Sequence, residues 1–162
     1  MKDLLLYLWK SNQHYAMQLL GDIDEGRLAE QPVGLPNHPA WTIAHLSVAS
    51  NYLLVPALGE TPMDLAGWDQ KFGYGSKPLP DRSAYPSKEE LIGIYTEQHR
   101  LVEQGIKSNF DKIIGVETPD ESMRAYFPTL DKMVGFMVSI HEANHWGQVC
   151  DWRRAIGLPN VM

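Results

Sequence analysis

The sequence has one cysteine, few basic residues and no long hydrophobic run. Because Cys150 is the single cysteine among 162 residues, the chain has no internal disulfide and no cysteine-rich zinc site. No apolar stretch approaches the ~20 residues that a membrane-spanning helix needs. The N-terminal segment lacks the small residues of a signal-peptide cleavage site and carries an early acid. We therefore expect a cytoplasmic protein without a membrane partner, whose first segment is a helix.

Negative charge predominates in the chain. Twenty acidic residues against fourteen basic ones give a net charge of −6, and the one basic cluster is Arg153-Arg154. Nucleic-acid binding needs a positive surface that neutralises phosphates, so we expect no nucleic acid among the partners. The content of 44% hydrophobic and 21% charged residues is typical of a globular protein rather than a disordered one. At this length we expect one domain over residues 1–162.

Helical periodicity is present in four segments, whereas no segment alternates as a β-strand does. The third segment has the clearest start, because Ser87-Lys-Glu-Glu90 forms a capping box. The fourth ends in basic residues followed by Gly157 and Pro159, as helix C-termini commonly do. The predicted helices cover about residues 2–20, 39–58, 87–109 and 129–155. We therefore predict an all-α fold, a four-helix bundle with long crossover connections.

Two of the connections are long and aromatic. Residues 110–127 end in Tyr126-Phe127. Residues 60–86 contain several Gly and Pro residues and four aromatic residues, Trp68, Phe72, Tyr74 and Tyr85. Long connections of this kind within a small domain are commonly functional lids or packed caps. We expect the 60–86 segment to form part of a pocket wall.

Two histidines four residues apart are the most informative feature of the sequence. On a helix, His141 and His145 point in the same direction, one turn apart. They share the apolar face with Val134, Val138 and Trp152. Two imidazoles at this spacing suit one divalent ion, and polar rings on an apolar face are costly unless a partner satisfies them. The pair alone indicates either a metal site or two hydrogen-bonded core histidines.

His45 is a third candidate ligand. It belongs to a predicted buried stripe of the second helix with Trp41, Val48 and Tyr52. The opposite side of that helix carries the polar residues Ser47, Ser50 and Asn51. Two facing helices would then offer three inward imidazoles, the ligand set of an open three-histidine metal site. The alternative is that His45 hydrogen-bonds a carbonyl or a tyrosine hydroxyl in the core.

The other histidines fit such a site less well. His38 precedes His45 by about 10.5 Å along a helix axis, and we place it at the entrance of the second helix. We expect His14 and His99 to be surface or boundary residues. Three polar residues are candidates for orienting the imidazoles or a bound water, with ordinary interhelix hydrogen bonds as the alternative: Gln98, Asn144 and Gln148.

The sequence His141-Glu-Ala-Asn-His145 also matches the H-E-x-x-H signature of zinc metalloproteases, in which the Glu is the general base. The residues after His145 include no His or Glu that could be a downstream third ligand, and no strand is expected that could hold a peptide. Helical spacing places Glu142 roughly 80° from the histidine pair. We expect Glu142 to be a solvated surface acid, which makes the protease the weakest of the candidate functions.

Three motifs together resemble the DinB/YfiT-like superfamily. They are Trp41-Thr-Ile-Ala-His45-Leu, His141-x3-His145-Trp-Gly-Gln148 and Arg153-Arg154-x2-Gly157-Leu-Pro159. With the helix order and the long second connection, the similarity covers essentially the whole chain. It implies a four-helix bundle with a crossover connection, often a homodimer. It also implies a divalent metal held by one histidine of the second helix and two of the fourth, which match His45, His141 and His145.

The chemistry that the resemblance implies is diverse. Characterised relatives include transferases and isomerases that use low-molecular-weight thiols such as mycothiol or bacillithiol, and others are described as metal-dependent hydrolases. We therefore expect a metal-dependent enzyme in which a divalent transition metal, with Zn, Ni or Fe as the first candidates, activates a thiol or water to act on a small-molecule substrate. The alternative is a non-catalytic bundle, either a metal-stabilised stress protein or a small-molecule binder.

Overall fold

The computed structural model describes residues 1–161 and consists of helices and their connections, which confirms the all-α prediction. Within that range the one extended pairing is an isolated antiparallel bridge between Glu117 and Thr129. The long α-helices are α1 (Lys2–Gly21), α2 (Pro39–Ala49), α5 (Lys88–Ile113), α7 (Leu130–Phe136) and α8 (Glu142–Ala155). Two π-helical segments continue them without a break: η2 (Ser50–Leu54), which leads from α2 into α3 (Val55–Ala57), and η4 (Met137–His141), which joins α7 to α8. The short helices are η1 (Glu25–Arg27), α4 (Trp68–Phe72), η3 (Arg82–Ala84) and α6 (Glu121–Arg124).

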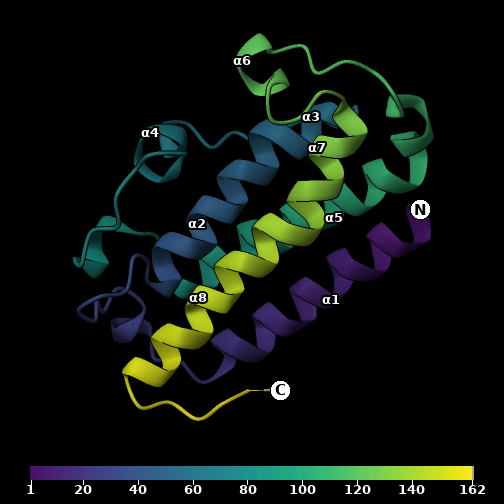
Figure 1. Ribbon diagram of the computed structural model, residues 1–162. Helices are drawn as coiled ribbons and strands as arrows, with labels where there is room; N and C mark the ends of the chain where they lie inside the picture. Colours follow the sequence, from purple (N-terminus) through teal and green to yellow (C-terminus); the bar gives the residue numbers. More distant parts are fainter. Residues whose placement is uncertain (162) are drawn as a thin grey trace.

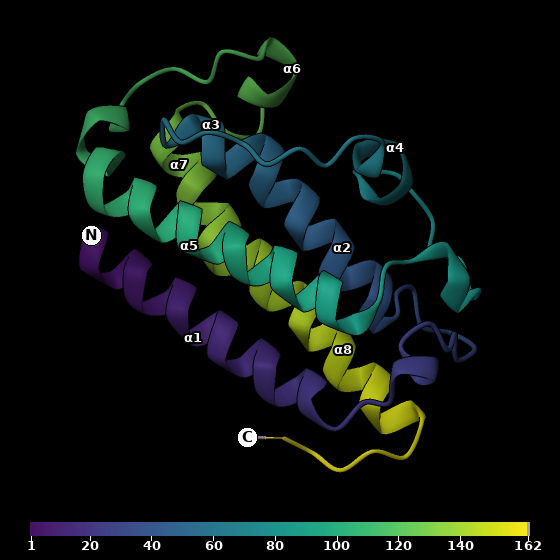
Figure 2. The ribbon, with the colours of Figure 1, turned by 180° about the vertical axis from the view of Figure 1, so that it is seen from behind.

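The long helices pack side by side around a shared core (Figures 1 and 2). Helix α5 contacts α1 and α2, and α8 contacts the same two helices. Each of α1, α2, α5 and α8 therefore contacts two of the others, and apolar side chains from these helices and from α7 fill the interior. None of the helices that the structure describes is long and apolar enough to cross a membrane.

The helix ends follow the signals in the sequence. The Ser87 hydroxyl accepts a hydrogen bond from the Glu90 amide at 3.2 Å, so α5 begins at the predicted capping box. The His38 ring caps α2 by accepting from the Trp41 amide at 3.3 Å, and Pro39 occupies the first turn. The predicted place of His38 at the entrance of the second helix is confirmed.

Helix α2 is buried on every side, which corrects the predicted division between its faces. All its residues from 39 to 48 are buried, including Ser47, and Ser50 and Asn51 of η2 are buried as well. Tyr52, expected in the buried stripe, is 44% exposed. The reason is that the 60–86 segment covers the side of α2 that faces away from the bundle, with α4 packed on that side (Figure 1). The wider turn of η2 also changes the angular position of the residues in it.

The segment 60–86, which we call the strap, runs along α2 in the opposite direction. Hydrogen bonds at four levels join the two. They are Asn51 Nδ2 to the Met63 carbonyl at 3.0 Å, His45 Nδ1 to the Phe72 carbonyl at 2.7 Å, Trp41 Nε1 to Ser76 Oγ at 3.1 Å and His38 Nε2 to the Leu79 carbonyl at 3.0 Å. The long aromatic connection is thus packed against the helix that carries His45.

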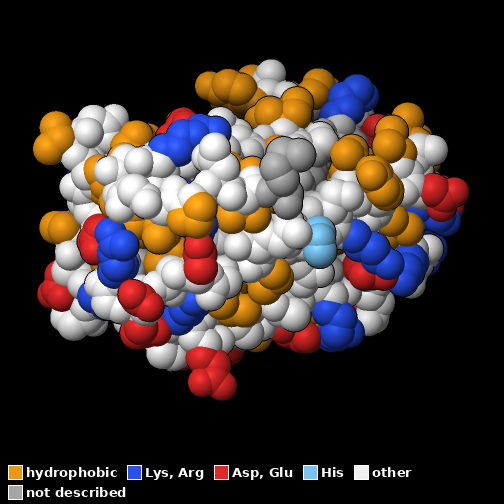
Figure 3. Space-filling model, turned by 90° about the horizontal axis from the view of Figure 1, so that it is seen from below, with side chains coloured by type: hydrophobic (Ala, Val, Ile, Leu, Met, Phe, Trp, Pro, Cys, Tyr) orange, Lys and Arg blue, Asp and Glu red, His pale blue; other side chains and the backbone are white. Residues whose placement is uncertain are grey.

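Charges of both signs are mixed on the face of the molecule shown in Figure 3. Lysine and arginine side chains lie next to aspartate and glutamate side chains there, with hydrophobic side chains between them. Two ion pairs join α1 to α5: Lys2 with Asp111 and Lys10 with Glu103, both at 3.0 Å. This mixed surface is in keeping with the net negative charge, and the expectation of no nucleic-acid partner stays a prediction.

Two glycines of α5 provide a test of how closely the helices pack. A Cβ added to Gly105 would lie 2.6 Å from Leu58 Cβ, whereas one added to Gly93 would meet nothing within 4 Å. Because the first contact forces helices apart, Gly105→Ala should lower the free energy of unfolding by about 1–3 kcal/mol. Gly93→Ala, at an exposed helical position, should raise it by up to about 1 kcal/mol. Urea unfolding measures both, and equal effects of the two variants would contradict the packing.

Candidate metal centre

The structure brings His45, His141 and His145 together between α2 and α8. One nitrogen of each ring lies within 4.8 Å of those of the other two, and His45 Nε2 is 3.4 Å from His141 Nε2. Two imidazole nitrogens bound at ~2.1 Å to one tetrahedral zinc would be roughly 3.4 Å apart. The spacing therefore fits a shared metal ion, and the three residues could hold one.

The His45 ring is fixed in the orientation that a metal ligand needs. Its Nδ1 is 2.7 Å from the Phe72 carbonyl oxygen. A carbonyl only accepts, so Nδ1 carries the proton and Nε2 keeps a free lone pair directed at His141. Trp41 stacks on the same ring, with centroids 4.5 Å apart and planes within 8°. The Phe72 carbonyl of the strap occupies Nδ1 of His45 and Trp41 of α2 covers the ring, so Nε2 is the nitrogen that is free to bind a metal.

The two other histidines come from the junction of η4 and α8. His141 is the last residue of η4, and His145 lies one turn later on α8. The Val138 carbonyl in η4 accepts a hydrogen bond from Asn12 of α1 at 2.9 Å, which satisfies a backbone group within the π-helical segment. Nδ1 of His145 is buried without a hydrogen-bond partner in the described part of the chain.

Burial keeps all three imidazoles neutral. Burial, together with repulsion from the neighbouring histidines, lowers the pKa of His145 to about 3 and that of His141 to about 4. Burial also lowers the pKa of His45, against the hydrogen bond to Phe72 that raises it. Neutral imidazole is the form that coordinates a metal. The site is therefore ready to accept a cation at neutral pH.

The three polar candidates lie in different places. Gln98 is buried on α5 and donates to Asn51 Oδ1 at 2.9 Å, so it supports the strap contact of Asn51. Asn144 is exposed on α8. Gln148 lies one turn beyond His145, and its Oε1 accepts from Asn37 Nδ2 at 2.6 Å. The structure thus brings Gln148 into contact with His145, whereas Gln98 is tied to Asn51 in the core.

Glu142 and His99 are buried, which corrects the expectation that Glu142 is a solvated surface acid and that His99 is a surface or boundary residue. Each is 2% exposed, and Glu142 Oε1 accepts hydrogen bonds from the Tyr95 hydroxyl and, at 2.6 Å, from His99 Nε2. The prediction was wrong because α8 has two buried sides, one toward α2 and one toward the interior near α5. The signal was present in the sequence, since Val138 and Trp146 flank Glu142 at four-residue spacing. His14 is exposed, as predicted.

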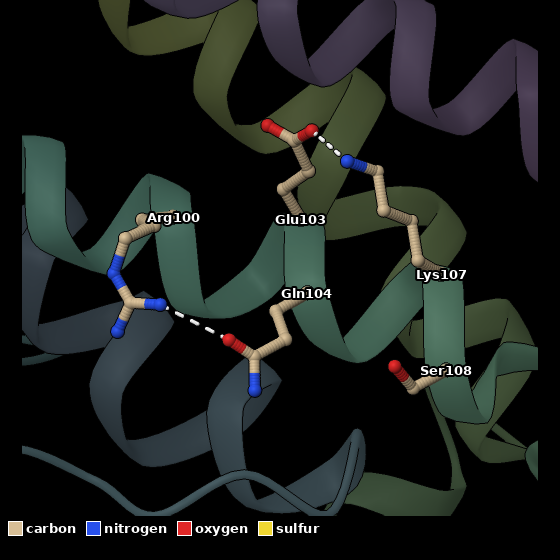
Figure 4. Close-up of a pocket in the computed structure, with 5 residues that line it drawn as sticks. All are labelled: Arg100, Glu103, Gln104, Lys107 and Ser108. Atoms are coloured by element: carbon tan, nitrogen blue, oxygen red, sulfur yellow. Dashed lines mark hydrogen bonds and ion pairs between the residues drawn. The ribbon is translucent and has the colours of Figure 1, made fainter.

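A surface hollow on α5 is separate from this centre (Figure 4). It has a volume of about 320 Å³ and is lined by residues of one helix: Arg100, Glu103, Gln104, Lys107 and Ser108. Four of its polar groups contact one another, Glu103 in an ion pair with Lys107 and Gln104 as the hydrogen-bond acceptor of Arg100. A hollow whose polar groups are already paired offers little to a ligand, so the histidine cluster is the stronger candidate site.

Comparison with known proteins identifies the family. A family model described as the DinB superfamily matches residues 8–149. The chain belongs to the DinB superfamily. The match includes the three clustered histidines of this DinB-superfamily protein and the helices that carry them. A search of curated proteins found no match.

The pKa values of the cluster predict how the metal-free protein responds to acid. Between pH 6.5 and about 4, the unfolded chain binds protons that buried His141 and His145 do not bind. The free energy of unfolding should therefore fall as the pH falls through this window. Replacing both residues by Gln should make this fall less steep. Urea unfolding in the presence of a chelator measures the slopes, and equal slopes in both proteins would contradict the assignment.

Proposed function

We propose that this DinB-superfamily protein is a metal-dependent enzyme in which His45, His141 and His145 hold one divalent transition metal ion. The observation that carries the proposal is the convergence of three neutral imidazoles, one with its proton held by a backbone carbonyl. Three protein ligands leave a coordination position for a substrate. A metal ion there would lower the pKa of a thiol or a water and so create a nucleophile at neutral pH.

The residues around the cluster would bind and shield a small molecule. Trp41 covers one side of His45, and the strap lies along the same helix, which limits the access of bulk water. We propose a low-molecular-weight thiol as the co-substrate of a thiol transferase, with hydrolysis by activated water as the second chemistry. Imidazole ligands suit zinc, nickel and iron, so each of these ions is a candidate.

Glu142 does not support the protease. The carboxylate that would act as general base in an H-E-x-x-H enzyme is held by Tyr95 and His99 in the interior of the bundle. A general base must reach the water that it deprotonates. In this protein the two histidines of the H-E-x-x-H motif would therefore bind the metal, whereas Glu142 would not act as a general base.

Elemental analysis of untagged protein, purified without a chelating resin, tests the centre. We expect about one equivalent of a transition metal in the wild type and its loss in His45→Ala and His141→Ala, because removal of one of three ligands breaks the site. His14→Ala is the matched control, since it removes an exposed histidine and should leave the metal content unchanged. A metal-free wild type, or full metal in both site variants, would refute the centre.

Cobalt substitution separates the enzyme from a non-catalytic metal-stabilised bundle. The low exposure of His45 (7%) and His145 (8%) favours the second candidate, in which the metal has no exchangeable position. If the site is open, a low-molecular-weight thiol added to the cobalt protein should produce a thiolate-to-metal charge-transfer band, because thiolate is a soft ligand for such ions. An unchanged spectrum at saturating thiol, and no loss of activity on metal removal, would favour the non-catalytic bundle.

A further inference from the structure

The buried Glu142 has no part in the proposed chemistry, yet it follows directly on a proposed ligand. We propose that Glu142 is a positioning residue, which, with Tyr95 and His99, fixes the rotation of α8 about its axis so that His141 and His145 face His45. This inference rests on the proposed metal centre.

Two side chains of α5 hold the Glu142 carboxylate at one oxygen. Tyr95 and His99 are four residues apart, one helical turn, and both donate to Oε1. All three side chains are at most 2% exposed. A buried carboxylate is costly unless it is paired and hydrogen-bonded, so the energy of this contact depends on its geometry. A rotation of α8 that moved Glu142 would break both hydrogen bonds.

The holding residues are themselves fixed by other helices. The His99 ring stacks on Trp9 of α1, with centroids 3.7 Å apart and planes within 11°. Trp9 Nε1 also donates to the His99 backbone carbonyl at 3.0 Å. Tyr95 packs edge-on against Trp146 of α8, with centroids 5.5 Å apart. The contact of Glu142 therefore joins three helices, α1, α5 and α8.

The position of Glu142 in the chain makes this contact matter for the metal ligands. Glu142 is the first residue of α8 after the π-helical segment η4. The wider turn of η4 changes the angle about the helix axis at which the residues after it project. The backbone links Glu142 to His141 directly, and His145 follows within the next turn. Whatever fixes the direction of Glu142 also fixes the direction of both imidazoles, on the side of the helix toward α2.

Metal affinity and coordination geometry test the role without reference to activity. In Glu142→Leu, which removes the acceptor, we expect the zinc dissociation constant, measured by competition with a chromophoric chelator, to rise about tenfold or more. The absorption spectrum of the cobalt protein should change as the coordination becomes less regular. In Glu142→Gln the amide oxygen still accepts both hydrogen bonds. The zinc affinity should therefore stay within about threefold of the wild-type value, and the cobalt spectrum should stay close to that of the wild type.

A second variant and a stability control keep the outcomes separate. Tyr95→Phe retains the ring but removes one hydrogen-bond donor to Glu142, and we expect it to weaken zinc binding several-fold. This variant replaces Glu142→Leu as the test if Glu142→Leu fails to fold. Ile106→Ala, a buried substitution two turns beyond His99 on α5, should lower stability and leave the zinc affinity unchanged. Wild-type affinity in Glu142→Leu, or in Tyr95→Phe where the first does not fold, would overturn the positioning role, as would an equal loss in Ile106→Ala. A wild type that binds no metal would overturn the proposed centre itself.

Discussion

Three imidazoles are buried together between α2 and α8. Each ring must direct one nitrogen toward the shared site, and its other nitrogen needs a hydrogen-bond partner. At His45 the Phe72 carbonyl meets both needs with one hydrogen bond of 2.7 Å. That bond ties the strap to the centre, because the segment that supplies the carbonyl also hydrogen-bonds to Trp41 of α2, to the capping residue His38 and to Asn51 of η2. The long connection is thus part of the construction of the site, and the burial of α2 on all sides follows from it.

Helix α8 serves two sides of the molecule at once. One side directs His141 and His145 toward α2, and the other directs Glu142 toward Tyr95 and His99 on α5. The two sides are coupled by the rigid helix between them. A buried polar contact that is satisfied in one geometry favours one rotation of the helix, a specificity that apolar side chains of similar size supply less well.

Local spacing in the sequence was sufficient to predict the long helices and to place His141 and His145 on one side of the last helix. That His45 meets this pair depends on the packing of two helices, and the family resemblance, not local spacing, implied it. Capping at Ser87 and the four-residue interval from His141 to His145 are properties of single helices. The burial of His99 and Asn51 depends on which segment covers which face, whereas the burial of Glu142 is indicated by the buried residues Val138 and Trp146 on either side of it at four-residue spacing. A helical wheel that assumes one buried side places polar residues of the opposite side in solvent. It takes no account of the strap that covers α2 or of the second buried side of α8. The π-helical turns at η2 and η4 shift the faces further and have no local signal that we recognise.

In the proposed centre, three histidines from α2, η4 and α8 bind one metal ion. X-ray absorption spectroscopy of the zinc-loaded, untagged protein tests it most directly, because it reports the type and distance of the coordinating atoms. For a three-histidine centre we expect a first shell of nitrogen and oxygen at about 2.0–2.1 Å with the outer-shell scattering of three imidazoles. A shell of oxygen atoms alone, or one with fewer than two imidazoles, would contradict it.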